Sequence, residues 1–180
     1  MSTPFELLLD LDQRARANSD GLPAQQDLKQ YWSGVGFSLA GERCVAPLSE
    51  VAEILHVPDS ITLVPGVKSW MKGVANSRGR LLLVMDLGEF LGLEPSSAST
   101  TRRILVLEQG DLICGLIVDG VQGMQHFEAD TFSDCIPAST SEALQPFLAG
   151  SYQREASYLV FSLFTLAEHA SFMQVALETA

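Results

Sequence analysis

Residues 73–87, GVANSRGRLLLVMDL, carry the clearest secondary-structure signal of the chain. This stretch joins a short, mainly apolar run to a longer apolar run through a polar segment. That segment contains Asn76 and Gly79, and both residue types adopt the backbone dihedrals of tight turns. The stretch therefore predicts a strand, a turn and a second strand.

Working outward, the chain from Tyr31 onward consists of short apolar or alternating runs that are separated by glycine-containing turns. Two further hairpins are predicted. One joins residues 37–39 to 44–48 around Gly41, and the other joins 104–107 to 112–118 around Gly110. Short antiparallel strands of this kind are typical of small β-barrels, so the fold class is mainly β.

Helices are expected in three places. Thr3, Pro4 and Glu6 match a helix start that continues to about residue 17, and residues 18–30, with Gly21 and Pro23, read as a linker. Apolar spacing also favours a short helix over residues 49–55 and a C-terminal helix over 164–176. The predicted division is an N-terminal helix and linker, residues 1–30, followed by a folded domain, residues 31–175.

An internal similarity links the two halves of this domain. Residues 37–51 resemble 106–121, and residues 81–90 resemble 157–166. Two related lobes would explain both pairs, although any two hairpins rich in leucine and valine look alike.

Composition excludes several classes of protein. The formal net charge is −11, which disfavours nucleic acid and anionic membranes as partners. No apolar run approaches the roughly 18–20 residues of a spanning helix, and no secretion signal is visible. Three widely spaced cysteines, Cys44, Cys114 and Cys135, read as reduced thiols, so a cytoplasmic protein is expected.

Chemistry-bearing motifs are missing. The sequence has neither a phosphate-binding loop nor a Gly-x-Ser-x-Gly nucleophile elbow. His56, His126 and His169 are too far apart, and too far from cysteines, to match metal-ligand spacing. No catalytic residue, metal or cofactor is expected. A Ser-His-Asp triad assembled by folding stays open, which keeps a small β-barrel hydrolase or ligand carrier as the alternative function.

Residues 60–85 contain no acid in this acidic chain but carry four cations, Lys68, Lys72, Arg78 and Arg80. Beside them are three apolar side chains that we expect to be exposed: Val67, Trp70 and Met71. Aromatic, methionine and arginine side chains are enriched at protein–protein contacts, so we interpret this stretch as a recognition surface. The alternative is that Trp70 and Met71 belong to the core and the cations decorate a solvated hairpin.

Residues 73–87 also resemble a known family. Residues 73–87 are similar to the strand, Asn-Leu-Arg-Gly turn and strand of CheW-like proteins, with Ser77 in place of the usual leucine. The resemblance continues through residues 41–42 and 47–54 before the turn and 115–121 after it, and it covers roughly residues 31–172.

This resemblance implies a fold of two small, intertwined, five-stranded SH3-like β-barrels. It also implies a non-enzymatic adaptor that couples the cytoplasmic tip of a methyl-accepting chemoreceptor to the CheW-like regulatory domain of a CheA-type histidine kinase. The extra N-terminal segment and the acidity are most similar to adaptors of type IV pilus twitching systems.

Within the family, partner binding maps to the first lobe and the cleft. The matching positions are Val51, Glu53, Gly73, Asn76, Arg78 and Gly79. Arg78 is expected either to brace loop carbonyls or to present its five donors to a partner, since the guanidinium geometry suits both roles.

Overall fold

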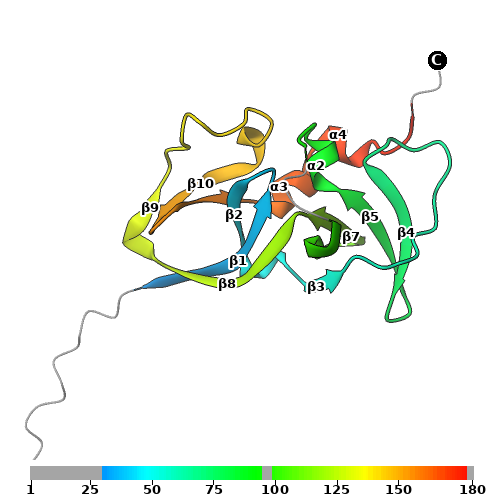
Figure 1. The fold of residues 1–180 in the computed structure, drawn as a ribbon, viewed down its shortest axis with the longest axis horizontal. Coiled ribbons are helices and arrows are strands. Elements are labelled where there is room, and N and C mark those ends of the chain that lie inside the picture. The colour runs from blue at the N-terminus through cyan, green and yellow to red at the C-terminus, as the bar shows by residue number, and fades with distance from the viewer. Residues whose placement is uncertain (1–29, 95–98, 178–180) are drawn as a thin grey trace, which may run out of the picture. The chain divides into compact units, whose positions relative to one another are not determined.

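The computed structural model describes residues 30–94 and 99–177. The predicted N-terminal helix and nearly all of the linker lie outside these residues, so the division at residue 30 stays a prediction. The described part contains two β-sheets with α3 (Leu163–Glu168) between them (Figure 1). Within this part, no helix has the length and hydrophobicity that crossing a bilayer requires.

The first sheet has six strands. Their order is β8 (Gly120–Glu128), β1 (Tyr31–Leu39), β2 (Glu42–Pro47), β11 (Ser157–Phe161), β10 (Leu148–Gln153) and β9 (Phe132–Ser133). The second sheet has five strands. Their order is β3 (Glu53–His56), β6 (Arg103–Gln109), β7 (Leu112–Val118), β5 (Arg80–Asp86) and β4 (Met71–Ser77). The mainly β prediction is confirmed, and the two-residue β9 adds a sixth strand to the first sheet.

The two halves of the chain exchange strands. The β1–β2 hairpin belongs to the first half, yet β2 pairs in parallel with β11 from the second half, with Cys44 opposite Leu159. The β6–β7 hairpin belongs to the second half, and β7 pairs in parallel with β5 from the first half, with Cys114 opposite Leu83. This correspondence agrees with the predicted duplication.

The core explains why several strands are apolar without alternation. One cluster includes side chains from both sheets, among them Phe37, Leu39, Leu105 and Leu116, and all four are buried. Separate clusters lie on the opposite faces of the sheets, around Phe127 in the first and around Val84 and Ile104 in the second. Strands that are buried on both faces read as continuous hydrophobic runs.

Two helix predictions were wrong in part. Over 49–55 the chain forms only a 3-10 turn, η1 (Leu48–Glu50), and then strand β3, because β6 offers a pairing edge and Ala52 N donates to Val106 O at 2.8 Å. The C-terminal segment forms α3 and α4 (Ala170–Met173), separated by His169 in an extended conformation.

The predicted recognition surface was also wrong for its aromatic part. Trp70 and Met71 are 7% and 6% exposed and belong to the central core. Trp70 stacks on Phe172 of α4 with ring centroids 5.8 Å apart and meets Phe90 edge to face at 5.2 Å. The core interpretation of these two residues is therefore correct. α2 (Leu87–Phe90) supplies the third ring of this cluster.

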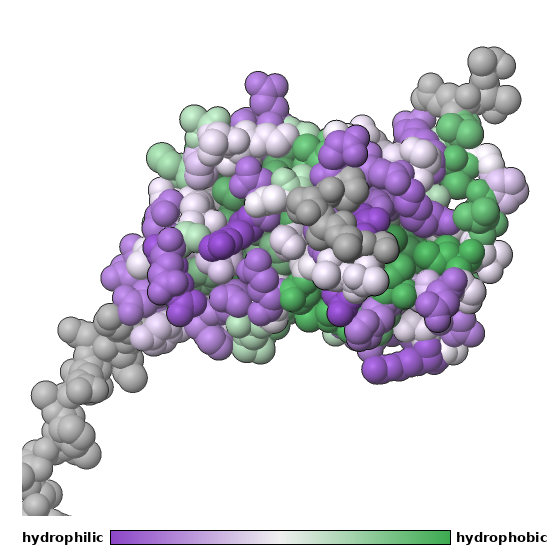
Figure 2. Space-filling view, in the orientation of Figure 1, coloured by the Kyte–Doolittle hydropathy of each residue, from purple (hydrophilic) through white to green (hydrophobic). Residues whose placement is uncertain are grey.

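Other hydrophobic side chains do reach the surface near this sheet. Figure 2 shows hydrophobic colour gathered over β4, β5 and the loop beside them. Leu63 in this loop is 80% exposed and Leu81 of β5 is 72% exposed. An exposed apolar patch beside charged side chains is a feature of binding surfaces.

Candidate partner-binding site

The turn of the β4–β5 hairpin is built by backbone conformation. Ser77 pairs with Arg80, so only Arg78 and Gly79 form the loop, and their φ angles are +52° and +81°. Positive φ at both positions matches the twist of an antiparallel hairpin. Asn76 stays in β4, and its side-chain Oδ1 accepts a hydrogen bond from Gly79 N at 2.8 Å.

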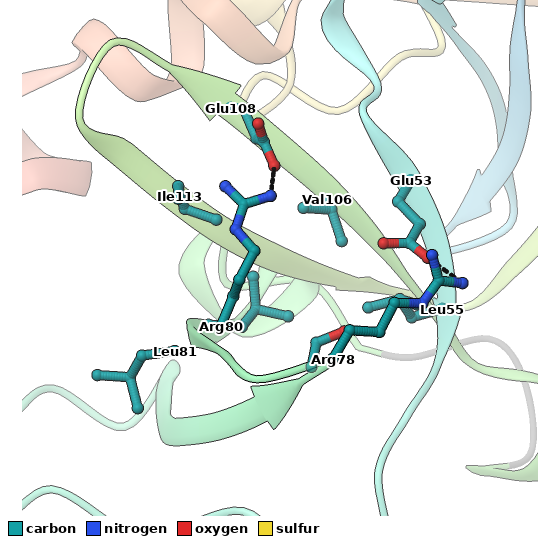
Figure 3. Close-up of a pocket in the computed structure, with 10 residues that line it drawn as sticks. Glu53, Leu55, Arg78, Arg80, Leu81, Val106, Glu108 and Ile113 are labelled. Atoms are coloured by element: carbon teal, nitrogen blue, oxygen red, sulfur yellow. Dashed lines mark hydrogen bonds and ion pairs between the residues drawn. The ribbon is translucent and has the colours of Figure 1, made fainter.

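Three cations of this region pair with acids from distant parts of the chain. Arg78 Nη2 lies 2.7 Å from Glu53 Oε1 of β3, and Arg80 Nη1 lies 2.7 Å from Glu108 Oε1 of β6 (Figure 3). Lys72 pairs with Glu89. The positive charge that is concentrated in the sequence is thus largely balanced in the fold.

A shallow groove lies between β3 and the β4–β5 turn, with a volume of about 130 Å³. Leu55, Leu82, Val106 and Ile113 form its apolar lining, and the Arg78–Glu53 and Arg80–Glu108 pairs contribute its charged lining. Leu81 points away from both ion pairs (Figure 3). A small apolar area with a charged rim is the usual composition of a protein–protein contact.

A second groove of about 140 Å³ has three lining residues in common with the first, Leu55, Ser77 and Leu82, and is also lined by Asn76 and His56. The two grooves therefore adjoin each other. The Arg78–Glu53 ion pair joins the hairpin turn to β3. Because the side chains of Arg78 and Glu53 are 79% and 32% exposed, this ion pair contributes less than about 1 kcal/mol to stability. Another carboxylate can therefore replace Glu53 as the partner of Arg78 at little cost.

The structure brings three of the six predicted site residues to the grooves: Glu53, Asn76 and Arg78. Gly79 belongs to the same turn but lines neither groove. Gly73 and Val51 are not among the residues lining either groove. Val51 is half-buried and packs against the central core. Gly73 has a φ of +136°, and a Cβ there would lie 2.2 Å from Thr62 O, so glycine is required by the fold.

Sequence reasoning missed two contributors to the grooves. Glu108 lies 28 residues after its partner Arg80, and no local pattern connects them. Leu81 sits in the uninterrupted run Leu81, Leu82, Leu83, where no alternation marks which leucine faces solvent.

The two buried cysteines show no sign of catalytic activation. Burial raises the pKa of Cys44, with a smaller contribution from the charge of Glu42, and burial raises the pKa of Cys114 from 9.0 to about 12. Both thiols are therefore protonated at neutral pH and are poor nucleophiles. Across residues 30–94 and 99–177, no cluster of three His, Cys, Asp or Glu side chains could hold a metal ion.

The chain belongs to the CheW-like domain family, whose sequence model matches residues 33–171.

Among individual relatives, the protein PilI of Pseudomonas aeruginosa is 54% identical over 176 residues, which cover 98% of each chain. The chemotaxis protein CheW of Helicobacter pylori is 30% identical over 112 residues, covering 62% of this chain and 67% of that one. The crystal structure of the scaffolding protein TtCheW from Thermoanaerobacter tengcongensis superposes with a TM-score of 0.65 at 26% identity, covering 79% of this chain and 96% of that one. These findings confirm the predicted resemblance.

Proposed function

We propose that this protein is a non-enzymatic adaptor that couples a methyl-accepting chemoreceptor to a CheA-type histidine kinase, in a pathway controlling type IV pilus twitching. Family membership and the 54% identity to PilI support the pathway. The structural observation that carries the proposal is the charged groove between β3 and the β4–β5 turn. No cofactor is needed, and the expected location is the cytoplasm, beside receptor arrays.

Arg78 is the central contact in this proposal. Its guanidinium is largely exposed and, among the described residues, pairs with Glu53, so a carboxylate on a partner can share or replace that acid. Leu55 and the exposed Leu81 offer apolar contact beside it. In a chain of net charge −11, this balanced region meets an acidic partner with less repulsion than the rest of the surface.

Signalling by such an adaptor follows from linkage. An adaptor that binds receptor and kinase together changes kinase activity only as far as its contacts differ between the receptor's states. A weak, exchangeable ion pair beside a shallow apolar groove suits this task, because small changes in partner geometry alter the contact.

The test is calorimetric binding of the purified protein to two probes from the same genome: the C-terminal regulatory domain of a CheA-type kinase and a soluble cytoplasmic fragment of a methyl-accepting receptor. Saturable 1:1 binding to the kinase domain is expected. Arg78→Glu should weaken binding to at least one probe roughly tenfold or more, since it places two acids side by side in the groove. Arg43→Glu, an equal charge change at an exposed position of β2, is the matched control.

Val51→Asp should also weaken binding, but Val51 is half-buried against the core, so part of its effect will be lost stability. Arg78→Glu is the cleaner variant. Wild-type binding by both variants would remove the site assignment, and absence of binding to both probes would contradict the adaptor function.

The alternative of a hydrolase or ligand carrier has little support in the geometry. Ser33 Oγ and His126 Nδ1 lie 2.7 Å apart, directly opposite each other on β1 and β8, but this pair is exposed. A catalytic site is normally a recess with converging polar groups. A screen with ester substrates should show no turnover that depends on Ser33.

A further inference from the structure

Glu50 links two distant parts of the chain. It is the last residue of η1, and its carboxylate receives three hydrogen bonds from the start of α3. Oε2 accepts from Leu163 N at 2.6 Å and from Phe164 N at 3.2 Å, and Oε1 accepts from Ser162 Oγ at 3.2 Å. The first amides of a helix have no partner within the helix, so this carboxylate satisfies donors that are otherwise unpaired.

α3 is a firm anchor for such a contact. Its Leu163 and Leu166 are fully buried in the central core. Ser162 N donates to Phe147 O at 2.9 Å, next to the first sheet, and Glu168 accepts from Gln109 at the end of β6 at 3.0 Å. The start of α3, to which Glu50 is hydrogen-bonded, is therefore connected to both sheets.

On its other side, Glu50 directly precedes the strand that lines the groove. β3 is a four-residue edge strand that pairs with β6 alone among the described strands. Glu53, which pairs with Arg78, is three residues after Glu50. Three residues of extended backbone cover about 10 Å. A displacement of Glu50 is thus passed directly to Glu53 and to the ion pair that crosses the groove.

We propose that Glu50 is a positioning residue for partner binding: by clamping the start of β3 to α3, it fixes Glu53, and through it Arg78, at the groove. This inference rests on the proposed function. It assigns a role in recognition to a side chain that does not line either groove. It also makes the register of β3 dependent on the C-terminal half of the chain.

A competing explanation is that Glu50 merely caps α3. In that case its removal lowers stability but leaves the affinity of the folded protein unchanged. If Glu50 positions β3, its removal also lowers affinity under conditions where every molecule is folded. The two explanations therefore separate when stability and binding are measured on the same variants.

The experiment compares wild type with Glu50→Ala, Glu50→Gln and Val160→Ala. Val160 is buried in the first sheet, away from β3, so Val160→Ala is a control for general destabilisation. Amide hydrogen exchange is measured at Ala52, Leu163 and Phe164, and affinity is measured for the receptor fragment and kinase domain named above, at a temperature where denaturant curves show all variants folded.

Glu50→Ala should speed exchange at Leu163 and Phe164 roughly tenfold or more, because two bonds to a charged acceptor are lost, and should also speed it at Ala52. Its affinity should fall roughly 3- to 30-fold, in the range of coupling mutations. Glu50→Gln keeps one acceptor oxygen and should lie between Glu50→Ala and wild type. Val160→Ala should bind like wild type.

Wild-type affinity in Glu50→Ala, together with unchanged exchange at Ala52, would overturn the positioning role and leave only a cap. Failure of the wild-type protein to bind either probe would instead overturn the proposed function. The exchange at Ala52 then decides by itself whether Glu50 holds β3: an increase beyond that of Val160→Ala supports the clamp, and no increase overturns it.

Discussion

Two glycines with similar sequence signals meet different surroundings in the fold. Gly73 and Gly79 both adopt positive φ, +136° and +81°. A Cβ on Gly79 would meet nothing within 4 Å, whereas one on Gly73 would collide with Thr62 O, which lies across the bridge between Thr62 and Val74. The family resemblance gives both glycines as partner-binding candidates, and the contact with Thr62 adds a requirement of the fold at Gly73.

Replacing each glycine with alanine should separate these roles. Both variants incur the cost of positive φ, about 1–2 kcal/mol, but only Gly73→Ala adds a backbone clash. We expect Gly73→Ala to lower the free energy of unfolding by at least about 2 kcal/mol more than Gly79→Ala in urea titrations. Equal midpoints for the two variants would show that the Thr62 segment moves aside without cost.

The buried thiols predict a dependence of stability on alkaline pH. Burial raises the pKa of Cys114 to about 12 and also raises that of Cys44, so the folded state keeps both protons while unfolded thiols release theirs above pH 9.0. The stabilisation is complete below that pH and is lost as pH rises toward the folded values.

The expected loss is about 1.4 kcal/mol per pH unit for each thiol above pH 9, measured by urea unfolding at several pH values. The matched control is Cys44→Ala/Cys114→Ala, which should be less stable at pH 8 but should show a shallower decline. A decline of the same slope in both proteins would assign the effect to other groups.

At the scale of the element, the β4–β5 hairpin combines a folding signal with a binding signal. Arg78 occupies a loop position with a φ of +52°, where asparagine is much preferred, and it makes an exposed ion pair of small energetic value. The hairpin thus carries an unfavourable turn residue whose charge reaches the groove. Unfavourable local choices of this kind are expected at functional sites.

Arg78→Asn should therefore leave stability within about 0.5 kcal/mol of wild type, or raise it, because a better turn residue offsets the lost ion pair. Partner binding should fall at the same time. The check is a denaturant curve beside a calorimetric titration. A loss of stability above about 1 kcal/mol would mean that the ion pair across the groove holds the fold together.

At the scale of the whole molecule, strand exchange ties the halves into one cooperative unit. Each sheet takes its central parallel pair from both halves, β2 with β11 and β5 with β7. The main hydrophobic cluster likewise contains residues of both halves. Neither half can bury its strands without the other, so a single unfolding transition is expected.

Cutting the chain between residues 94 and 99 tests this arrangement. Each fragment alone should lack the near-ultraviolet circular dichroism of packed aromatic rings, and mixing the two fragments should restore it, since the missing strands are supplied in trans. A fragment that gives a native-like spectrum alone would contradict the requirement for strand exchange.

Local sequence patterns were enough to predict the β class, the three hairpins and the family. These depend on local patterns: glycine turns, apolar runs and the motif of residues 73–87. Only the tertiary structure decided that residues 53–56 form an edge strand, that Trp70 and Met71 are buried, that Glu108 lines the groove, and that Glu50 bonds to the start of α3. The physical reason is that edge pairing, burial and ion pairs depend on partners far away in the chain, as when Glu50 caps a helix that begins at Leu163.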